Sequence, residues 1–169
     1  MMSSRAKILT AVAAAGVVIV DQLTKAWALE VLLGGNTISI IDGFLALRLG
    51  FNYGLAFGIL GHVPEAWRGV VAFLPVIAFL ILLRLMRDGL AHGGPSVITL
   101  GLVLGGAVGN LVDRVRIGAV VDFVDLYWRG LHWPAFNVAD SAITIGVGVL
   151  AASMIRSDSG NAKAPSGDA

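Results

Sequence analysis

The sequence of 169 residues contains no cysteine. This absence excludes disulfide bonds, thiolate metal sites, cysteine nucleophiles and acyl groups attached through a thiol. Charge is also scarce, because 14% of the residues are charged whereas 57% are hydrophobic. The net charge is +1 and the basic residues are scattered, so we expect no nucleic acid partner. The mean hydropathy of +0.85 is too high for an ordinary soluble domain. Composition therefore predicts a small integral membrane protein.

Metal-ligand spacing is missing as well. The three histidines, His62, His92 and His132, are isolated in the sequence and do not form a pattern typical of a zinc site. The pair Gly105-Gly106 lacks the preceding strand that a phosphate-binding loop requires, so we interpret it as a packing feature. We expect neither a metal nor another cofactor.

Four apolar segments have the length that a helix needs to cross the hydrocarbon core, about 20 residues. They run approximately over residues 8–29, 67–86, 96–112 and 138–155. Because backbone polar groups must be paired in lipid, each segment is predicted to be a helix, and Pro75 should bend the second. The predicted fold is an integral membrane, mainly α protein, with a single membrane-embedded domain over residues 1–156.

The first apolar segment has some features of a cleavable signal peptide, since a basic stretch ending at Lys7 precedes it. However, the apolar run continues to Val20, and the segment then carries Asp21 and Lys25. We therefore interpret it as an uncleaved transmembrane helix.

A less apolar region, residues 36–58, separates the first two predicted helices. Residues 37–40 alternate polar and apolar side chains, residues 44–49 form a second extended candidate, and Asp42-Gly43 between them is a hairpin signal. We expect a small extramembrane β-sheet platform here. The polar, small residues at 157–169 are predicted to be a disordered tail.

Glycine spacing and aromatic residues add detail to the second half of the chain. Gly101, Gly105 and Gly109 follow one another at intervals of four, which lets helices approach closely. The mixed segment 115–134 contains aromatic residues of the kind that favour a membrane–water interface, namely Tyr127, Trp128 and Trp133. Four helices place both termini on one side, but the 12 basic residues divide equally between the two sides, so charge does not settle the orientation.

Asp122 and Asp140 are the most unusual residues of the sequence. Both are carboxylates flanked by long apolar stretches, and an ionisable residue near membrane depth is a functional hypothesis by default. Two such residues close in sequence suggest acid–base chemistry by a carboxylate pair. Asp125, by contrast, is interpreted as a solvated loop residue.

Two polar sets on predicted helices have a structural and a functional interpretation. Asp21 and Lys25 are four residues apart and share a helix face, so they form either an ion pair near the membrane surface or a brace for the site. Asn110, Asp113 and Arg114 also share a face, and they either form a polar helix end or orient a neighbouring carboxylate.

Three further residues also have both a structural and a functional interpretation. Asn52 and Gly54 are typical turn residues. Asn137 precedes the fourth helix and suits an N-cap, with Asp140 in the first turn favourable to the helix dipole.

Five short motifs together resemble the signal peptidase II family of lipoprotein signal peptidases. They are 21-DQLTK-25, 52-NYGLAF-57, 106-GAVGNLVDR-114, 120-VVDF-123 and 136-FNVAD-140. Each motif alone is weak, but the five occur in order on four predicted membrane segments, and the similarity covers residues 5–156.

This resemblance implies an aspartic endopeptidase of the bacterial inner membrane with four transmembrane helices and an extramembrane β-cradle. It implies that Asp122 and Asp140 are the catalytic dyad. It further implies a set of supporting and substrate-binding residues, which are Asp21, Lys25, Asn52, Gly54, Asn110, Asp113, Arg114 and Asn137.

The resemblance also implies the substrate and the orientation. The substrate is a prolipoprotein whose lipobox cysteine carries diacylglycerol, cleaved on the N-terminal side of that cysteine. The termini are expected in the cytoplasm and the active site towards the periplasm, with membrane lipids as the other partner of a monomeric enzyme. A proton-coupled transporter is the competing hypothesis, but it predicts acidic residues spread through membrane depth. A structural membrane subunit would not explain the polar residues.

Overall fold

A computed structural model describes residues 3–53 and 97–161 of the chain. The predicted helix over residues 67–86, the predicted end of the platform after Tyr53 and the last part of the tail lie outside the described residues. So does Gly54.

The three other predicted membrane segments are helices, with bounds α1 (Ser4–Val31), α3 (Val97–Ile117) and α4 (Val138–Asn161). Within the described ranges, α1 and α3 have the length and hydropathy of membrane spans, and the apolar part of α4, Val138–Ser153, is shorter. Ser3 caps α1, because its side chain accepts a hydrogen bond from the Ala6 N–H at 3.2 Å.

The end of α4 differs from the prediction. Residues 157–161 were expected to belong to a disordered tail, yet the helix continues to Asn161. Extending an existing helix costs much less than starting one, so polar residues of modest helix propensity can prolong the apolar turns before them. Likewise, α3 continues past the predicted end near residue 112 to Ile117, and its last turn carries Arg114 and Arg116, which are favourable at a helix C-terminus.

The strands form a four-stranded antiparallel sheet in the order β1-β2-β3-β4. The strands are β1 (Thr37–Ile41), β2 (Leu45–Asn52), β3 (Val120–Trp128) and β4 (Leu131–His132). The predicted hairpin at Asp42-Gly43 is confirmed, and Gly43 has a φ of 77°, which glycine adopts without strain.

Half of this sheet was not predicted. The segment 115–134 was interpreted only as a mixed interfacial region, whereas it supplies β3, β4 and the turn between them. The reason lies in the burial of β3, whose first four residues are all buried. Strand alternation of apolar and polar residues appears when one sheet face meets water, so the pattern that signals a strand is missing here.

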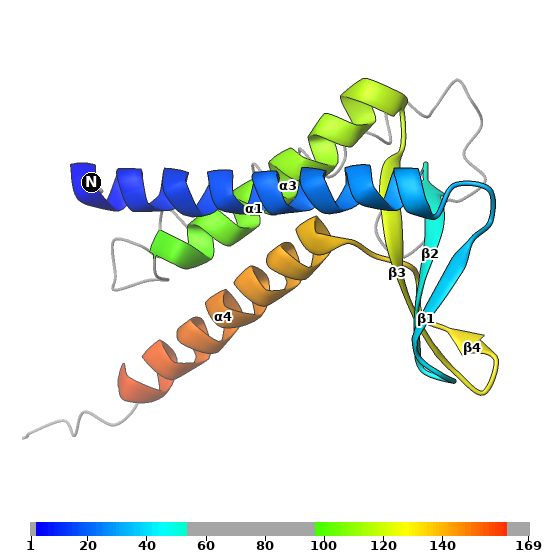
Figure 1. Cartoon of the computed structure of the whole chain (residues 1–169). Coiled ribbons are helices and arrows are strands. Elements are labelled where there is room, and N and C mark those ends of the chain that lie inside the picture. Colours follow the sequence, from blue (N-terminus) through cyan, green and yellow to red (C-terminus); the bar gives the residue numbers. More distant parts are fainter. Residues whose placement is uncertain (1–2, 54–96, 162–169) are drawn as a thin grey trace, which may run out of the picture.

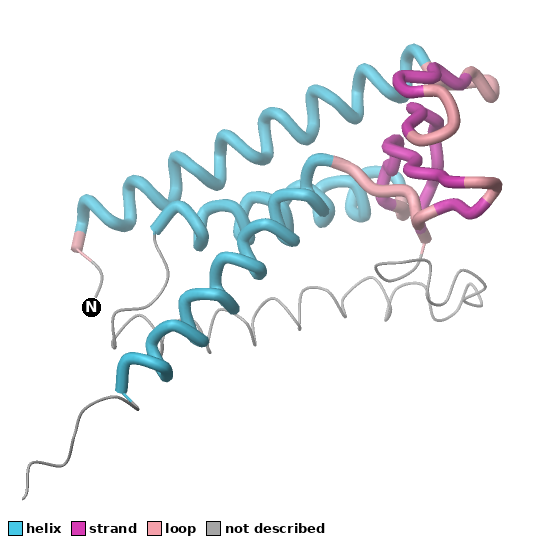
Figure 2. Tube along the Cα trace, turned by 90° about the horizontal axis from the view of Figure 1, so that it is seen from below, coloured by secondary structure: helices cyan, strands magenta, loops and turns pink. Residues whose placement is uncertain are grey.

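The sheet lies at one end of the three described helices, where α1 and α3 end and α4 begins (Figures 1 and 2). A small core holds this junction together. Ala28 and Leu32 near the end of α1 contact Phe123 of β3, and partly buried side chains of β2 and α4 pack around them. The sheet is thereby fixed directly against the helix ends.

Glycines allow α3 to contact α1 and α4 at backbone distance. A Cβ placed on Gly105 would lie 2.6 Å from the carbonyl oxygen of Ala14 in α1 and 2.6 Å from Cβ of Val17. A Cβ on Gly106 would collide with the carbonyl oxygen of Ala139 in α4. The close approach predicted from the glycine spacing is therefore confirmed, and α3 is the central helix of the three.

Replacing Gly105 with alanine should destabilise the protein. The new methyl group would meet backbone atoms of α1, which cannot move aside as a flexible side chain can, so we expect a loss of about 1–3 kcal/mol. Thermal unfolding in detergent measures this loss. Gly148→Ala is the matched control, because Gly148 is exposed and has no neighbour within 4 Å. Equal unfolding temperatures for the two variants would contradict the packing argument.

Candidate active site

A buried lysine lies where α1 meets α3. The Lys25 Nζ is 2.8 Å from Asp21 Oδ2, 2.8 Å from Asp113 Oδ2 and 2.9 Å from Asn110 Oδ1. Lys25 is 2% exposed and Asp21 is fully buried. The three ammonium protons thus have three oxygen acceptors. The predicted Asp21–Lys25 pair is confirmed, but it is a buried group that joins two helices, not a surface ion pair.

Gln22 completes this cluster, and the sequence analysis did not single it out. Its Nε2 lies 3.2 Å from Asp21 Oδ2, 3.2 Å from the Gly109 carbonyl oxygen and 2.9 Å from Asp113 Oδ1. The signal was available, since Gln22 lies inside the first of the five motifs. An amide bound between two carboxylates adds donors without adding charge.

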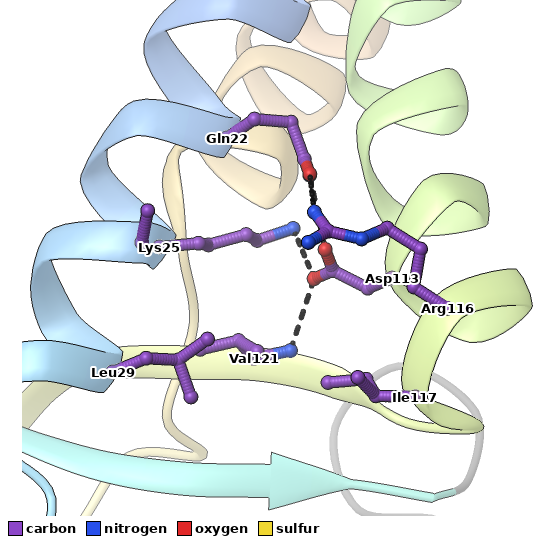
Figure 3. A pocket seen from close by; sticks show the side chains of 8 residues that line it. Gln22, Lys25, Leu29, Asp113, Arg116, Ile117 and Val121 are labelled. Atoms are coloured by element: carbon purple, nitrogen blue, oxygen red, sulfur yellow. Dashed lines mark hydrogen bonds and ion pairs between the residues drawn. The ribbon is translucent and has the colours of Figure 1, made fainter.

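Asp113 connects the cluster to the sheet. Its Oδ2 accepts a hydrogen bond from the Val121 N–H at 3.1 Å, so the residue before Asp122 is fixed to α3. Figure 3 shows this bond next to the Lys25–Asp113 ion pair, at a cavity of about 70 Å³ between α1, α3 and β3. At the same cavity the Arg116 Nη1 donates a hydrogen bond to the Gln22 Oε1 at 3.4 Å.

Asn110 forms hydrogen bonds with both Lys25 and Asp140. Its Oδ1 accepts from Lys25 Nζ and, at 3.2 Å, from Asn137 Nδ2. Because a lysine ammonium only donates, the oxygen of the Asn110 amide must face Lys25 and the NH₂ must face the other way. That NH₂ donates to Asp140 Oδ1 at 2.8 Å. Asn110 thus orients a neighbouring carboxylate, which was one of its two interpretations.

Asn137 is fully buried and directly precedes α4, which begins at Val138. Its Oδ1 accepts from the Asp140 N–H at 2.9 Å, and the Asp140 Oδ2 accepts from the Asn137 N–H at 3.3 Å. This reciprocal pair is a capping box, with aspartate in the place of the usual glutamate. The predicted N-cap is confirmed, and the cap also fixes the direction of the Asp140 carboxylate.

The side-chain NH₂ of Asn137 reaches the second acidic residue. It donates to Asp122 Oδ1 at 2.7 Å and to the Val121 carbonyl oxygen at 3.1 Å. One asparagine therefore contacts both Asp122, on β3, and Asp140, on α4. The structure brings together the two carboxylates that the sequence analysis selected.

Asp122 is 3% exposed, and this burial changes the pKa of its carboxyl group. Burial raises the pKa of Asp122 from 3.8 to about 7, and the nearby charge of Asp140 adds to the rise. Hydrogen bonds from Asn52 and Asn137 and the charge of Lys25 oppose it. Asn52 thus belongs to the site and lies at the end of β2, paired with Val120.

Arg114 approaches the same group from α3. Its Nη1 donates to the Asn110 carbonyl oxygen at 3.2 Å, and its guanidinium is close enough to interact electrostatically with Asp140 and Asp122. With Gly54 outside the described residues, every other predicted site residue belongs to one connected polar group.

Asp125 does not belong to this group, and its prediction was wrong. It was interpreted as a solvated loop residue, but it is 3% exposed and lies on β3. Its carboxylate is 2.9 Å from His132 Nδ1 and 3.4 Å from Arg48 Nη2. Asp125 was misread because β3 was not recognised as a strand, and its partners come from β2 and β4.

The described ranges contain no group of three or more His, Asp or Glu residues placed to hold a metal ion. The site consists of two carboxylates, four amides, a buried ammonium with its acidic partners and a guanidinium. Such a set can exchange protons, stabilise developing charge and orient a polar substrate.

Comparisons with known proteins agree on one family. The family model described as Signal peptidase (SPase) II matches residues 13–156. The "Lipoprotein signal peptidase" of Syntrophus aciditrophicus is 42% identical over 151 residues, covering 88% of this chain and 93% of that protein. The protein of the same description from Nitratidesulfovibrio vulgaris is 41% identical over 165 residues, covering 94% and 96%.

A solved structure is also similar. It is described as a bacterial membrane enzyme determined by the in meso method at 2.3 Å resolution, and it matches with a TM-score of 0.69. The two sequences are 29% identical, and the match covers 92% of this chain and 93% of that one.

Lys25→Met should be strongly destabilising. Removing the ammonium leaves two buried carboxylates without their cation, which typically costs about 3–5 kcal/mol. Lys7→Met, at an exposed position of the same helix, is the control. Adding Asp21→Asn and Asp113→Asn to Lys25→Met should restore part of the loss. Thermal unfolding that is unchanged by Lys25→Met alone would refute the ion-pair role.

Asp122→Asn should make the protein more stable at neutral and alkaline pH. Because the folded state raises this pKa to about 7, stability falls as pH rises from about 3.8 to about 7. At about 1.4 kcal/mol per pKa unit, the loss is on the order of 4 kcal/mol. Asparagine cannot ionise, so the variant avoids this loss.

Unfolding temperatures measured across this pH range test the idea. The gain of Asp122→Asn over the unmodified protein should be absent near pH 4 and full above pH 7. Asp125→Asn is the control on the same strand, and it should give no such gain because its carboxylate contacts Arg48 and His132. A gain independent of pH would show that burial of the Asp122 charge is not the cause.

Proposed function

This chain belongs to the signal peptidase II family of aspartic peptidases, whose members remove signal peptides from prolipoproteins, and we propose that Asp122 and Asp140 are its catalytic pair. The observation that carries this proposal is Asn137, which donates to Asp122 and caps the helix that bears Asp140. Two carboxylates held by one buried amide are suited to act on a common water molecule.

The proposed substrate is a prolipoprotein whose cysteine already carries diacylglycerol, cleaved on the N-terminal side of that cysteine. Acyl chains add about 0.8 kcal/mol of membrane affinity for each buried CH₂ group. The lipid would therefore hold the scissile bond near the bilayer surface, and the site lies where the membrane helices meet the sheet. Membrane lipids are the second partner, and we propose that the enzyme acts as a monomer.

The proposed topology has four transmembrane helices, with residues 67–86 as the second, in the bacterial inner membrane. The termini lie in the cytoplasm and the site faces the periplasm. The acidic residues of the site lie in the second half of α1 (Asp21), near the end of α3 (Asp113) and in the first turn of α4 (Asp140). This placement supports a one-sided site and does not suit the transporter hypothesis, which needs acidic residues at several depths.

In the proposed reaction the pair begins with one proton. Two interacting carboxylates titrate as a unit, and a pKa of Asp122 near 7 supports retention of one proton close to neutral pH. The ionised carboxylate takes a proton from water, and the water oxygen bonds to the scissile carbonyl carbon. The protonated carboxyl donates to the carbonyl oxygen and stabilises the tetrahedral intermediate.

The intermediate then breaks at its carbon–nitrogen bond. The departing nitrogen takes the proton that came from water, and the carboxyl proton is shared again by the pair. Asn110 and Asn137 would hold the two carboxylates in the required directions throughout.

Other residues are assigned supporting roles in this proposal. Asp21, Lys25 and Asp113 brace the Asn110 amide and the start of β3. Arg114 and Asn52 would help to bind the substrate backbone or the developing charge, and Gly54 is proposed from the family motif alone.

Asp122→Asn and Asp140→Asn should each lower turnover of a diacylglyceryl-modified substrate by a factor of about 10²–10⁴, the usual contribution of general acid–base groups. Cleavage in detergent or nanodiscs, followed by mass change of the substrate, measures this. Asp125→Asn is the control, a buried aspartate three positions along the same strand that contacts neither Asp122 nor Asp140 through any of its described bonds.

Near-normal turnover in either Asp122→Asn or Asp140→Asn would remove that residue from the pair. The same assay with a substrate lacking diacylglycerol tests the lipid separately. Equal rates on both substrates would contradict lipid-assisted positioning but would leave the catalytic pair intact.

A further inference from the structure

Large exposed apolar side chains occur at the β1–β2 turn and at the β3–β4 turn. Figure 1 shows both turns at the end of the sheet that lies away from α1. We call this group the apolar tip, and it consists of Ile41, Phe44, Trp128, Leu131 and Trp133. They are 52%, 45%, 60%, 78% and 57% exposed, respectively. An exposed cluster of this size on an extramembrane sheet marks an interaction surface.

Hydrogen bonds hold the two parts of the tip together. The Tyr127 N–H donates to the Phe44 carbonyl oxygen at 2.9 Å, which joins the β1–β2 turn to the end of β3. The Gly43 N–H donates to the Tyr127 hydroxyl oxygen at 3.2 Å. Trp128 pairs directly with Leu131 across the β3–β4 turn. The tip is therefore one surface built from two adjacent hairpins.

The height of the sheet relative to the bilayer follows from α1. This helix has 28 residues and is about 42 Å long, compared with about 30 Å of hydrocarbon and 40–45 Å including the headgroup layers. β1 begins at Thr37, soon after α1 ends at Val31. The strands cross the direction of α1 instead of continuing it (Figure 1). With α1 along the membrane normal, the sheet would extend sideways at the level of the headgroups.

Exposed apolar side chains also occur on α1 and along the chain between α1 and the tip. Leu23 on α1 is 66% exposed, as expected of a lipid-facing residue. Leu33 after α1 is 62% exposed, and Ile38 and Ile40 on β1, which lie between α1 and the tip along the chain, are 36% and 53% exposed. Exposed apolar residues that follow a membrane helix so closely along the chain are most simply covered by the same lipid.

The chemistry of the tip suits the interfacial layer. Tryptophan is enriched at membrane–water interfaces, where its ring is apolar and its N–H can reach a polar group. The exposed Arg129 lies with its guanidinium carbon 5.9 Å from the centre of the Trp128 ring. A cation beside an interfacial aromatic residue is complementary to lipid phosphates.

We propose that the apolar tip inserts into the headgroup layer of the bilayer that the helices span, and that it anchors the sheet at a fixed depth. The helices fix one end of the sheet and the tip fixes the other. Since β3 carries Asp122, the anchor would also set the height of the candidate site above the hydrocarbon. This inference concerns lipid binding and does not depend on the catalytic roles.

Tryptophan fluorescence in nanodiscs of phosphatidylcholine and phosphatidylglycerol tests the proposal. One variant keeps only Trp128, through Trp27→Phe, Trp67→Phe and Trp133→Phe, and a second keeps only Trp133. A third keeps only Trp27, which is 40% exposed on α1 and serves as the membrane reference. Quenching is compared for lipids brominated near the carboxyl end or near the methyl end of their acyl chains, and for aqueous acrylamide.

We expect Trp128 and Trp133 to lose more emission with bromines near the carboxyl end than near the methyl end. Their emission should be shifted to the blue, and acrylamide should quench them less than it quenches free tryptophan. If a triple variant fails to fold, Trp128→Phe with Trp133→Phe in the otherwise unchanged protein gives the same information, as a loss of lipid-quenched emission.

Other occupants of the tip give different results, and each would overturn the proposal. Full access to acrylamide without lipid quenching would mean that the tip lies in water. A blue shift that depends on the protein-to-lipid ratio, without lipid quenching, would mean that a second copy of the chain covers it. Lipid quenching that appears only with substrate would assign the tip to substrate binding.

Discussion

The ammonium of Lys25 is the constraint on which the site depends. It is buried between Asp21 of α1 and Asp113 of α3, and a charge in that position is tolerable only because each of its protons has an oxygen acceptor. Small residues make the geometry possible, since a Cβ on Gly109 would lie 2.5 Å from an Asp21 oxygen. The ion pairs therefore require the close packing of α1 and α3. If either helix shifted, a buried charge would lose its partner.

Starting from Lys25, the side-chain amides of Asn110 and Asn137 determine how the two carboxylates are oriented. Lys25 only donates, so it determines which way the Asn110 amide faces, and Asn110 then donates to Asp140. Asn137 accepts from the Asp140 backbone and donates to Asp122. An amide has a donor end and an acceptor end, and it carries no charge of its own. Asn110 and Asn137 can therefore orient the two carboxylates without adding a charge of their own.

The sequence predicted the three described helices, the first hairpin and nearly all of the polar group, because spacing along a helix and the five motifs report them directly. It did not predict β3, Gln22 or the true setting of Asp125. Strand β3 is buried at its start and so lacks alternation. The partners of Asp125 come from β2 and β4, and such pairings depend on sheet register, which spacing along the chain does not reveal. The members of the polar group were predictable, whereas the sheet that positions Asp122 was not.

Burial of Asp122 explains why the site needs so much support. Burial and a neighbouring carboxylate raise the pKa of Asp122 to about 7, so ionisation of Asp122 opposes folding at neutral pH. Acid–base catalysis of amide hydrolysis nevertheless requires a proton that is easily gained and lost. The opposing stabilisation must come from elsewhere in the fold. It is available in the close helix contacts at Gly105 and Gly106, in the core around Leu32 and Phe123, and in the capping box of α4. The close packing at the junction between helices and sheet therefore offsets the cost of burying two neighbouring acids.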